Sequence, residues 1–327
     1  MKHKKVWTGI GAFAGMLILI LDSRTALSGA RTGLDLVLKT VIPSLFPFIF
    51  LSIVLTDAYS GTSLSILKPV GKLFRLPEGA EMLLLPAFLG GYPAGAQAVC
   101  SAYRRGCFST ENGRQLLAFC NNAGPSFLFG MISGFFPDLR MVWILWAIHI
   151  FSAWIAAQFF PCTPERVHLP SENRASSLSS GLQATVKVMA VICGWVILFR
   201  IVIAFLDRWI LWVLPVSART AVIGLLELSN GCCALGDVID LRLRFVLCSG
   251  MLAMGGLCVA MQTASVVGEL SLGRYLPGKL LQTAFSIGIS FCIVYRFWLP
   301  LGILSLISLV LLGKRKKSSS IPRTVGV

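Results

Sequence analysis

Two polar runs decide the fold of this chain: residues 90–97 read GGYPAGAQ, and residues 121–126 read NNAGPS. Each run lies inside an apolar segment and places glycine, proline and amide side chains where a plain membrane span carries leucine and valine. In hydrocarbon, unpaired backbone groups cost several kcal/mol each, so broken backbone is tolerated only where protein buries it or a watery cavity receives it. The two runs therefore predict interrupted membrane segments beside a polar site.

The composition around these runs is that of a membrane protein. The chain has 327 residues, of which 56% are hydrophobic and 13% charged, and its mean hydropathy is +0.79; soluble domains carry about 25% charged residues. We therefore predict an all-α polytopic membrane protein with about 8–10 membrane segments, each about 20 residues long where it crosses.

The charge pattern argues against a nucleic-acid partner. The net charge of +15 comes from 29 Lys and Arg against 14 Asp and Glu, but most basic residues lie singly or in pairs between apolar segments. That arrangement is typical of residues that set membrane topology. Since no basic run is interleaved with aromatic residues, we expect the bilayer and a small polar solute as partners, and no nucleic acid.

No metal, cofactor or enzymatic activity is expected. Most of the ten cysteines lie in apolar segments, where a free cysteine behaves as a small hydrophobe. The chain has no CxxC pair, its three histidines are scattered, and it shows no HExxH motif, paired carboxylates or Ser/His/Asp arrangement. The sequence thus indicates a protein that is not an enzyme.

The N-terminal residues 1–36 are predicted to form a signal-anchor span followed by an amphipathic segment. Lysines precede an apolar run at residues 6–21, which favours an uncleaved anchor with its N-terminus inside over a cleaved signal peptide. Residues 24–39 read as a surface helix leading into the next span. The basic cluster at residues 314–317 places the C-terminus inside as well.

Residues 82–102 allow two topologies, a single broken span or a re-entrant hairpin. Arg104 and Arg105 follow at once, on the side expected for basic residues if the segment turns back, so the charges favour the hairpin. Upstream, Pro43 and Pro47 predict a kinked helix in which Ser44 rebonds freed backbone. His149, in the span at residues 139–160, is read chiefly as a histidine bonded inside the bundle, with a proton relay as the alternative.

The second half of the chain repeats the order of the first. Val41 to Asp57 aligns with Val191 to Asp207 at a constant offset of 150 residues, and LGGYPAG at residues 89–95 corresponds to LELSNG at residues 226–231. Each half thus has a leading span and two broken segments, a pattern that indicates a transport site at the midplane. The predicted divisions are 1–36, 37–161 (first repeat), 162–183 (polar linker), 184–275 (second repeat) and 276–327 (C-terminal spans and basic tail).

These motifs resemble the YlbJ-type sporulation integral membrane proteins of the nucleoside-recognition, or Gate, domain family. The resemblance is carried by PSLFPF at residues 43–48, GGYPAGA at 90–96, NNAGPSF at 121–127, Glu227 with Gly231, and GGLCVAMQ at 255–262. It implies a multi-pass protein of the bacterial cell (inner) membrane, linked to sporulation and spore cortex formation. The family's domain also resembles parts of nucleoside transporters and FeoB iron transporters, but this chain lacks the GxxxxGK[ST] run of a GTPase.

Glu227 is the sharpest candidate for a functional residue, because acidic side chains inside apolar segments usually face a cavity or a partner. The competing interpretation is an ion pair with Arg200. Amide side chains offer donors and acceptors for a nucleobase-like or sugar-like solute. Bonding between helices is an equal alternative for any one of them, but for Asn121 and Asn122, beside Gly124-Pro125, the solute site is favoured. The predicted substrate-binding residues are Gly91, Tyr92, Pro93, Gln97, Asn121, Asn122, Gly124, Ser126, Glu227, Asn230, Gly255, Gly256 and Gln262.

Two functions compete. The first is a transporter of an unidentified small polar solute, with nucleosides as one candidate class. The second is a structural or assembly protein of the sporulation membrane that transports nothing. A transporter needs the broken segments of both halves to meet around one polar site, and this convergence is the structural prediction that the sequence makes.

Overall fold

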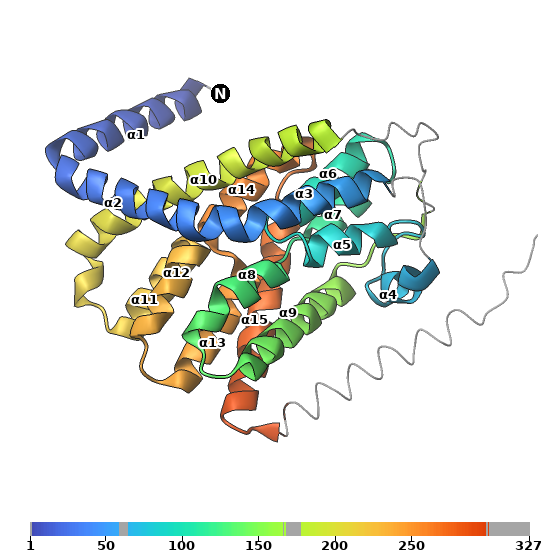
Figure 1. Cartoon of the computed structure of the whole chain (residues 1–327). Helices are drawn as coiled ribbons and strands as arrows, with labels where there is room; N and C mark the ends of the chain where they lie inside the picture. Colours follow the sequence, from blue (N-terminus) through green and yellow to red (C-terminus); the bar gives the residue numbers. More distant parts are fainter. Residues whose placement is uncertain (1, 59–64, 166, 168–177, 299, 301–327) are drawn as a thin grey trace, which may run out of the picture.

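The computed structural model describes residues 2–58, 65–165, 167, 178–298 and 300, and every regular element among them is a helix (Figure 1). Five of these helical segments are long and apolar enough to cross a membrane: Ser23–Leu55, Leu139–Phe159, Leu178–Trp209, Leu241–Leu270 and Tyr275–Val294. The predicted class, an all-α polytopic membrane protein, is therefore confirmed, while the number of segments beyond these five stays a prediction.

The helices of the first half run as follows: α1 (Lys2–Leu21), α2 (Ser23–Leu36), a π-helical turn (Val37–Val41), α3 (Ile42–Ala58), α4 (Lys68–Leu73), α5 (Leu84–Phe88), α6 (Ala94–Arg104), α7 (Thr110–Leu117), α8 (Pro125–Gly130) and α9 (Leu139–Phe159). Those of the second half are α10 (Leu178–Trp209), α11 (Val216–Leu226), α12 (Leu228–Ala234), α13 (Leu241–Met254), α14 (Gly256–Val267) and α15 (Tyr275–Val294). Short 3₁₀ turns lie at Ser65–Leu67, Glu81–Leu83, Ile132–Phe135, Leu211–Val213, Leu235–Asp237 and Gly268–Leu270.

The N-terminal amphipathic segment lies in a continuous helical run, Ser23–Leu55, that includes the apolar helix following it. α2 continues through the π-helical turn into α3, and α2 packs along α10 (Figure 1). A Cβ added to Gly29 would lie 3.0 Å from Ile201 Cα of α10, whereas Leu27 and Leu34 are exposed. Glycines let the two backbones approach closely, and this contact holds the segment on the bundle.

Two prolines lie at the start and in the interior of α3. Pro47 lies inside α3 and Pro43 at its first turn, just after the π-helical turn. The hydroxyl of Ser44 donates to the carbonyls of Thr40 at 2.7 Å and Val41 at 3.2 Å. A side-chain donor thus bonds carbonyls of the turn that precedes the first proline.

Residues 82–102 form a hairpin of two short helices, as the charges favoured. α5 and α6 pack against each other, and a Cβ on Gly95 would lie 3.0 Å from Ala87 Cα in the opposite arm. In the second half α11 and α12 form the matching hairpin, with Gly231 in close contact with the backbone of Gly224. Glycines at the crossing point allow both hairpins to close.

The remaining broken segments come next in each half. α7 and α8 are separated by residues 118–124, and α13 and α14 are separated by Gly255, whose φ is 72°. That left-handed conformation is one that glycine adopts without steric cost. The order of leading helix, hairpin, broken segment and span is therefore the same in both halves.

Parts of two predicted regions lie outside the described residues. Half of the polar linker is among them, and α10 begins at Leu178, inside the stretch assigned to the linker. The basic cluster at residues 314–317 is also outside them. The ten cysteines are all free, as expected for thiols in apolar segments.

Candidate functional site

Within each half, the two breaks lie backbone against backbone. A Cβ on Gly124 would come within 2.9 Å of the Gly91 nitrogen, which joins the hairpin break to the α7–α8 break. A Cβ on Gly256 would come within 2.8 Å of the Gly224 carbonyl oxygen, which joins the α11–α12 hairpin to the α13–α14 break. Only glycine fits such contacts, so these positions bring broken segments together.

Tyr92 joins the breaks of the two halves. Its hydroxyl donates to the carbonyl oxygen of Leu252 at 3.0 Å, in the last turn of α13. A Cβ on Gly255 would lie 3.2 Å from Tyr92 Cζ, so the ring packs directly on the second-half break. The broken segments of the two halves therefore meet, and the Tyr92–Leu252 hydrogen bond is one of the contacts between them.

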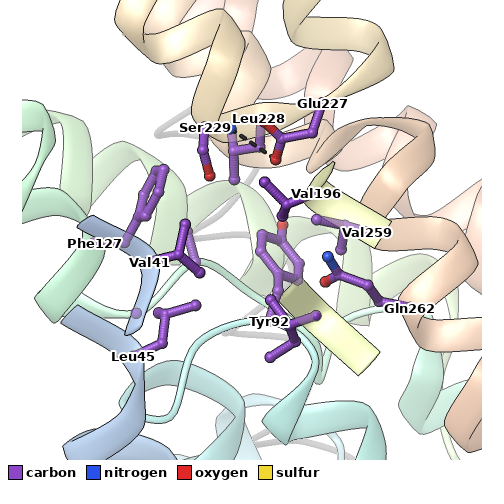
Figure 2. Close-up of a pocket in the computed structure, with 13 residues that line it drawn as sticks. Val41, Leu45, Tyr92, Phe127, Val196, Glu227, Leu228, Ser229, Val259 and Gln262 are labelled. Carbon is purple, nitrogen blue, oxygen red and sulfur yellow. Dashed lines mark hydrogen bonds between the residues drawn. The ribbon is translucent and has the colours of Figure 1, made fainter. Parts of the chain in front are cut away.

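A small central cavity lies at this junction. Its volume is about 30 Å³, which is room for about one water molecule. Figure 2 shows Tyr92 and Gln262 on one side of it and Glu227 and Ser229 on the other. The lining residues are Val41, Leu45, Tyr92, Ala123, Gly124, Phe127, Ile192, Val196, Glu227, Leu228, Ser229, Val259 and Gln262. Both leading helices and all the broken segments thus contribute to one cavity.

Glu227 is buried and caps α12. Its Oε1 accepts from the Ser229 backbone N–H at 3.0 Å, and its Oε2 accepts at 2.6 Å from both the backbone and the side-chain N–H of Asn230. The alternative of an ion pair with Arg200 was wrong, because Arg200 Nη1 lies instead 3.9 Å from Asp207 Oδ2. Hydrogen bonds, not a counter-ion, hold this carboxylate at the cavity.

Replacing Glu227 by alanine is expected to destabilise the protein by about 2 kcal/mol or more, because a cap is lost and buried N–H groups lose their acceptor. Asp240 caps α13 in the same way but is exposed, accepting from the Arg242 N–H at 2.9 Å. Asp240→Ala should therefore cost only about 1 kcal/mol. Thermal unfolding of both variants in detergent checks this, and equal losses would show that the burial of Glu227 adds nothing.

The two asparagines are fully buried but lie beside the cavity instead of lining it. Asn121 Nδ2 donates to Thr263 Oγ1 at 3.0 Å, and its Oδ1 accepts from the Ala96 N–H at 3.3 Å. Asn122 Oδ1 accepts from Gln282 Nε2 at 3.0 Å. In this conformation both amides bond between segments, which was the alternative given for them.

Gln97 points elsewhere. It lines a separate cavity of about 160 Å³ together with Ser52, Pro86 and Ala184, between α3, the first hairpin and α10. Its Oε1 is buried with no hydrogen-bond partner among the described residues, as is Ser126 Oγ. Of the predicted amide side chains, Gln262 is the one that lines the central cavity, while Asn230 binds Glu227.

His149 is bonded inside the bundle, as its main interpretation predicted. Its Nε2 accepts from the backbone N–H of Ala123 at 3.1 Å, in the α7–α8 break. Its carbonyl oxygen accepts from Gln282 Nε2 at 3.3 Å. The histidine therefore holds the break against α9 and α15.

Sequence reasoning missed Lys279, which is completely buried in α15. Its Nζ donates to Gln282 Oε1 at 2.8 Å, Tyr92 Oη at 3.1 Å and Asn122 Oδ1 at 3.3 Å. A lysine near the start of an apolar segment is typical of a membrane interface, so its position alone offered no reason to place Lys279 in the interior. The available signal was Gln282 three residues later, since positions i and i+3 share a helix face.

The fold and this junction define a class: a polytopic all-helical membrane protein of two halves whose broken helices meet in the interior. Among known proteins, the chain is similar to the sporulation integral membrane protein YlbJ of Bacillus subtilis (strain 168), with 22% identity over 334 residues that cover 86% of this chain and 80% of YlbJ. This similarity supports the YlbJ-type family that the motifs indicated. No family model matches the chain, and no solved structure matches it.

Proposed function

We propose that the chain is a transporter that moves a small polar solute across the cell membrane during sporulation, with both termini in the cytoplasm. The observation that carries the proposal is the meeting of both halves at one cavity, where Tyr92 bonds to Leu252 at 3.0 Å. Broken helices at corresponding positions of two repeats are the arrangement in which transporters hold solutes. The similarity to YlbJ, a sporulation integral membrane protein, supports the setting.

The solute class to examine first is nucleoside-like, as the resemblance to the Gate family implies. The cavity offers an aromatic ring at Tyr92, an amide at Gln262 and a hydroxyl at Ser229, which together suit a flat, polar ligand. The cavity volume of about 30 Å³ is too small to hold such a solute. Transport therefore requires the two halves to move apart and expose the junction to each side in turn.

The alternative function is a non-transporting structural or assembly protein of the sporulation membrane. One observation favours it: Asn121 and Asn122 bond to protein groups, and the central cavity holds little empty space. A scaffold would keep this closed packing at all times, whereas a transporter must open it.

Accessibility of the cavity separates the two functions without knowledge of the solute. Ser229 lines the cavity, so in a transporter the thiol of Ser229→Cys is expected to react with a membrane-impermeant reagent. A cysteine at Ser249, which is buried and bonded to Ser286 Oγ at 2.8 Å, is the matched control and should stay unmodified. Peptide mass spectrometry locates the modified residues, so the native cysteines can remain. Protection of both cysteines under every condition would favour the scaffold.

The substrate is then sought by uptake into proteoliposomes across nucleosides, amino sugars and divalent cations. Accumulation of one class that is lost in Glu227→Gln or Gln262→Leu would support the proposed site. Uptake that both variants retain in full would move the site away from the central cavity.

A further inference from the structure

The ammonium of Lys279 lies in a cage of neutral oxygens contributed by three different elements. Tyr92 Oη comes from the first hairpin, Asn122 Oδ1 from the α7–α8 break and Gln282 Oε1 from α15, at 3.1, 3.3 and 2.8 Å from Nζ. An ammonium has three N–H donors, so the three oxygens satisfy it completely. No Asp or Glu among the described residues forms an ion pair with it.

We propose that Lys279 is the binding site of the coupling ion and that this ion is a proton. Hard oxygens that converge from broken segments are what transporters use to hold a monovalent metal cation. Here the ammonium of Lys279 occupies that place. Because this group is covalently part of α15, its charge can leave only as H⁺, when one Nζ–H bond breaks and the proton passes to water. The inference rests on the proposed transport function and names its coupling ion.

Hydrogen-bond direction explains how this proton would act on the fold. The amide oxygens of Asn122 and Gln282 can only accept, since the Gln282 amide group donates to Asn122 Oδ1 and to the His149 carbonyl. When Lys279 is charged, the Tyr92 hydroxyl accepts from Nζ and donates to Leu252 O across the junction. When Lys279 is neutral, its lone pair needs a donor, and the Tyr92 hydroxyl is the one donor in the cage. Loss of the proton therefore turns Tyr92 away from Leu252 and breaks this hydrogen bond between the two halves, while the bond between Asn121 and Thr263 remains.

The surroundings leave Lys279 as the group that can carry this switch. The titratable side chains near it are Tyr92, Cys120, His149 and Tyr275. α13, which packs along α15, contributes the buried Cys248 and Ser249. The charged groups of α7 and α13 are engaged elsewhere. Arg114 donates to the Leu270 carbonyl and Arg244 to the Val238 carbonyl, Arg242 lies over the Tyr295 ring, and Glu111 pairs with Arg274.

A direct test follows the charge of Lys279 in the full chain in lipid nanodiscs, labelled with nitrogen-15 at lysine Nζ. The resonance that disappears in Lys279→Met should change from ammonium to amine within the pH range in which the protein stays folded. His149→Gln should keep this transition, and exchange of Na⁺ for choline at constant ionic strength should not shift it. A resonance that stays ammonium up to the pH of unfolding, or that responds to Na⁺, would overturn the proposal.

Hydrogen exchange of the peptide spanning residues 252–258, corrected for intrinsic pH effects, tests the hydrogen bond from Tyr92 to Leu252. In the native protein, exchange should accelerate about tenfold when Lys279 loses its proton, which corresponds to about 1.4 kcal/mol. In Tyr92→Phe this peptide should exchange fast at every pH, because the hydroxyl that donates to Leu252 is absent. Lys279→Met should exchange slowly at every pH, because Tyr92 then keeps Leu252 as its acceptor. Equal pH dependence in the native protein and Lys279→Met would refute the switch.

Neither measurement contains a solute, so the two proposals can fail separately. If Lys279 titrates and exchange at residues 252–258 changes with it while the cavity never opens, the transport function is wrong and the proton switch stands. If the cavity opens and solute moves with unchanged pH dependence in Lys279→Met, transport stands and the assignment of Lys279 is wrong.

Discussion

Replacing Gly278 by alanine is expected to abolish the native packing of α15. A Cβ at this position would lie 2.7 Å from both Cα and Cβ of Ala118 and in still closer contact with its carbonyl oxygen. These are mostly backbone atoms at the end of α7, and they cannot rotate away as a side chain can. We expect a loss of about 3 kcal/mol or more, at the upper end for an overpacked core.

Gly288→Ala provides the matched control on the same helix. No atom lies within 4 Å of a Cβ at Gly288, and alanine favours a helix over glycine by up to about 1 kcal/mol. Its melting temperature should therefore equal or exceed that of the native protein, whereas Gly278→Ala should melt earlier or aggregate on purification. If both variants were equally stable, the approach of α15 to Ala118 would be wrong, and with it the position of the neighbouring Lys279.

Replacing Asn122 by leucine is the second change with a large expected effect. Asn122 Oδ1 accepts from Lys279 Nζ at 3.3 Å and from Gln282 Nε2 at 3.0 Å. Leucine removes both contacts and leaves a buried ammonium short of an acceptor, which should cost about 3–5 kcal/mol, as for other uncompensated buried charges. Unfolding of the purified variant in detergent measures the loss.

A double-mutant cycle identifies the origin of that loss. In the Lys279→Met background no ammonium remains, so Asn122→Leu should cost at least about 1 kcal/mol less than it does alone. Asn112 is an equally buried amide that bonds to Thr163 and shares no hydrogen-bond partner with this cage. Asn112→Leu and Lys279→Met should therefore be additive to within about 0.5 kcal/mol. Additivity for Asn122 as well would show that its amide does not stabilise the ammonium.

The sequence by itself determined the class of the protein, the position of most breaks and their order in both halves. Glycine, proline and long apolar runs act through local backbone physics, so GGYPAGAQ at residues 90–97 predicts a break wherever the segment packs. The charges next to this run, at Arg104 and Arg105, favoured the hairpin that α5 and α6 form.

Only the tertiary structure decided which side chains meet. Gln97 and Gln262 follow glycine pairs at the same spacing, yet Gln262 lines the central cavity and Gln97 a separate one. Lys279 joins Tyr92 across 187 residues of chain, and no local pattern contains such a contact. The physical reason is that the backbone alone fixes where a helix breaks, whereas the direction of a polar side chain depends on the donors and acceptors that packing brings to it.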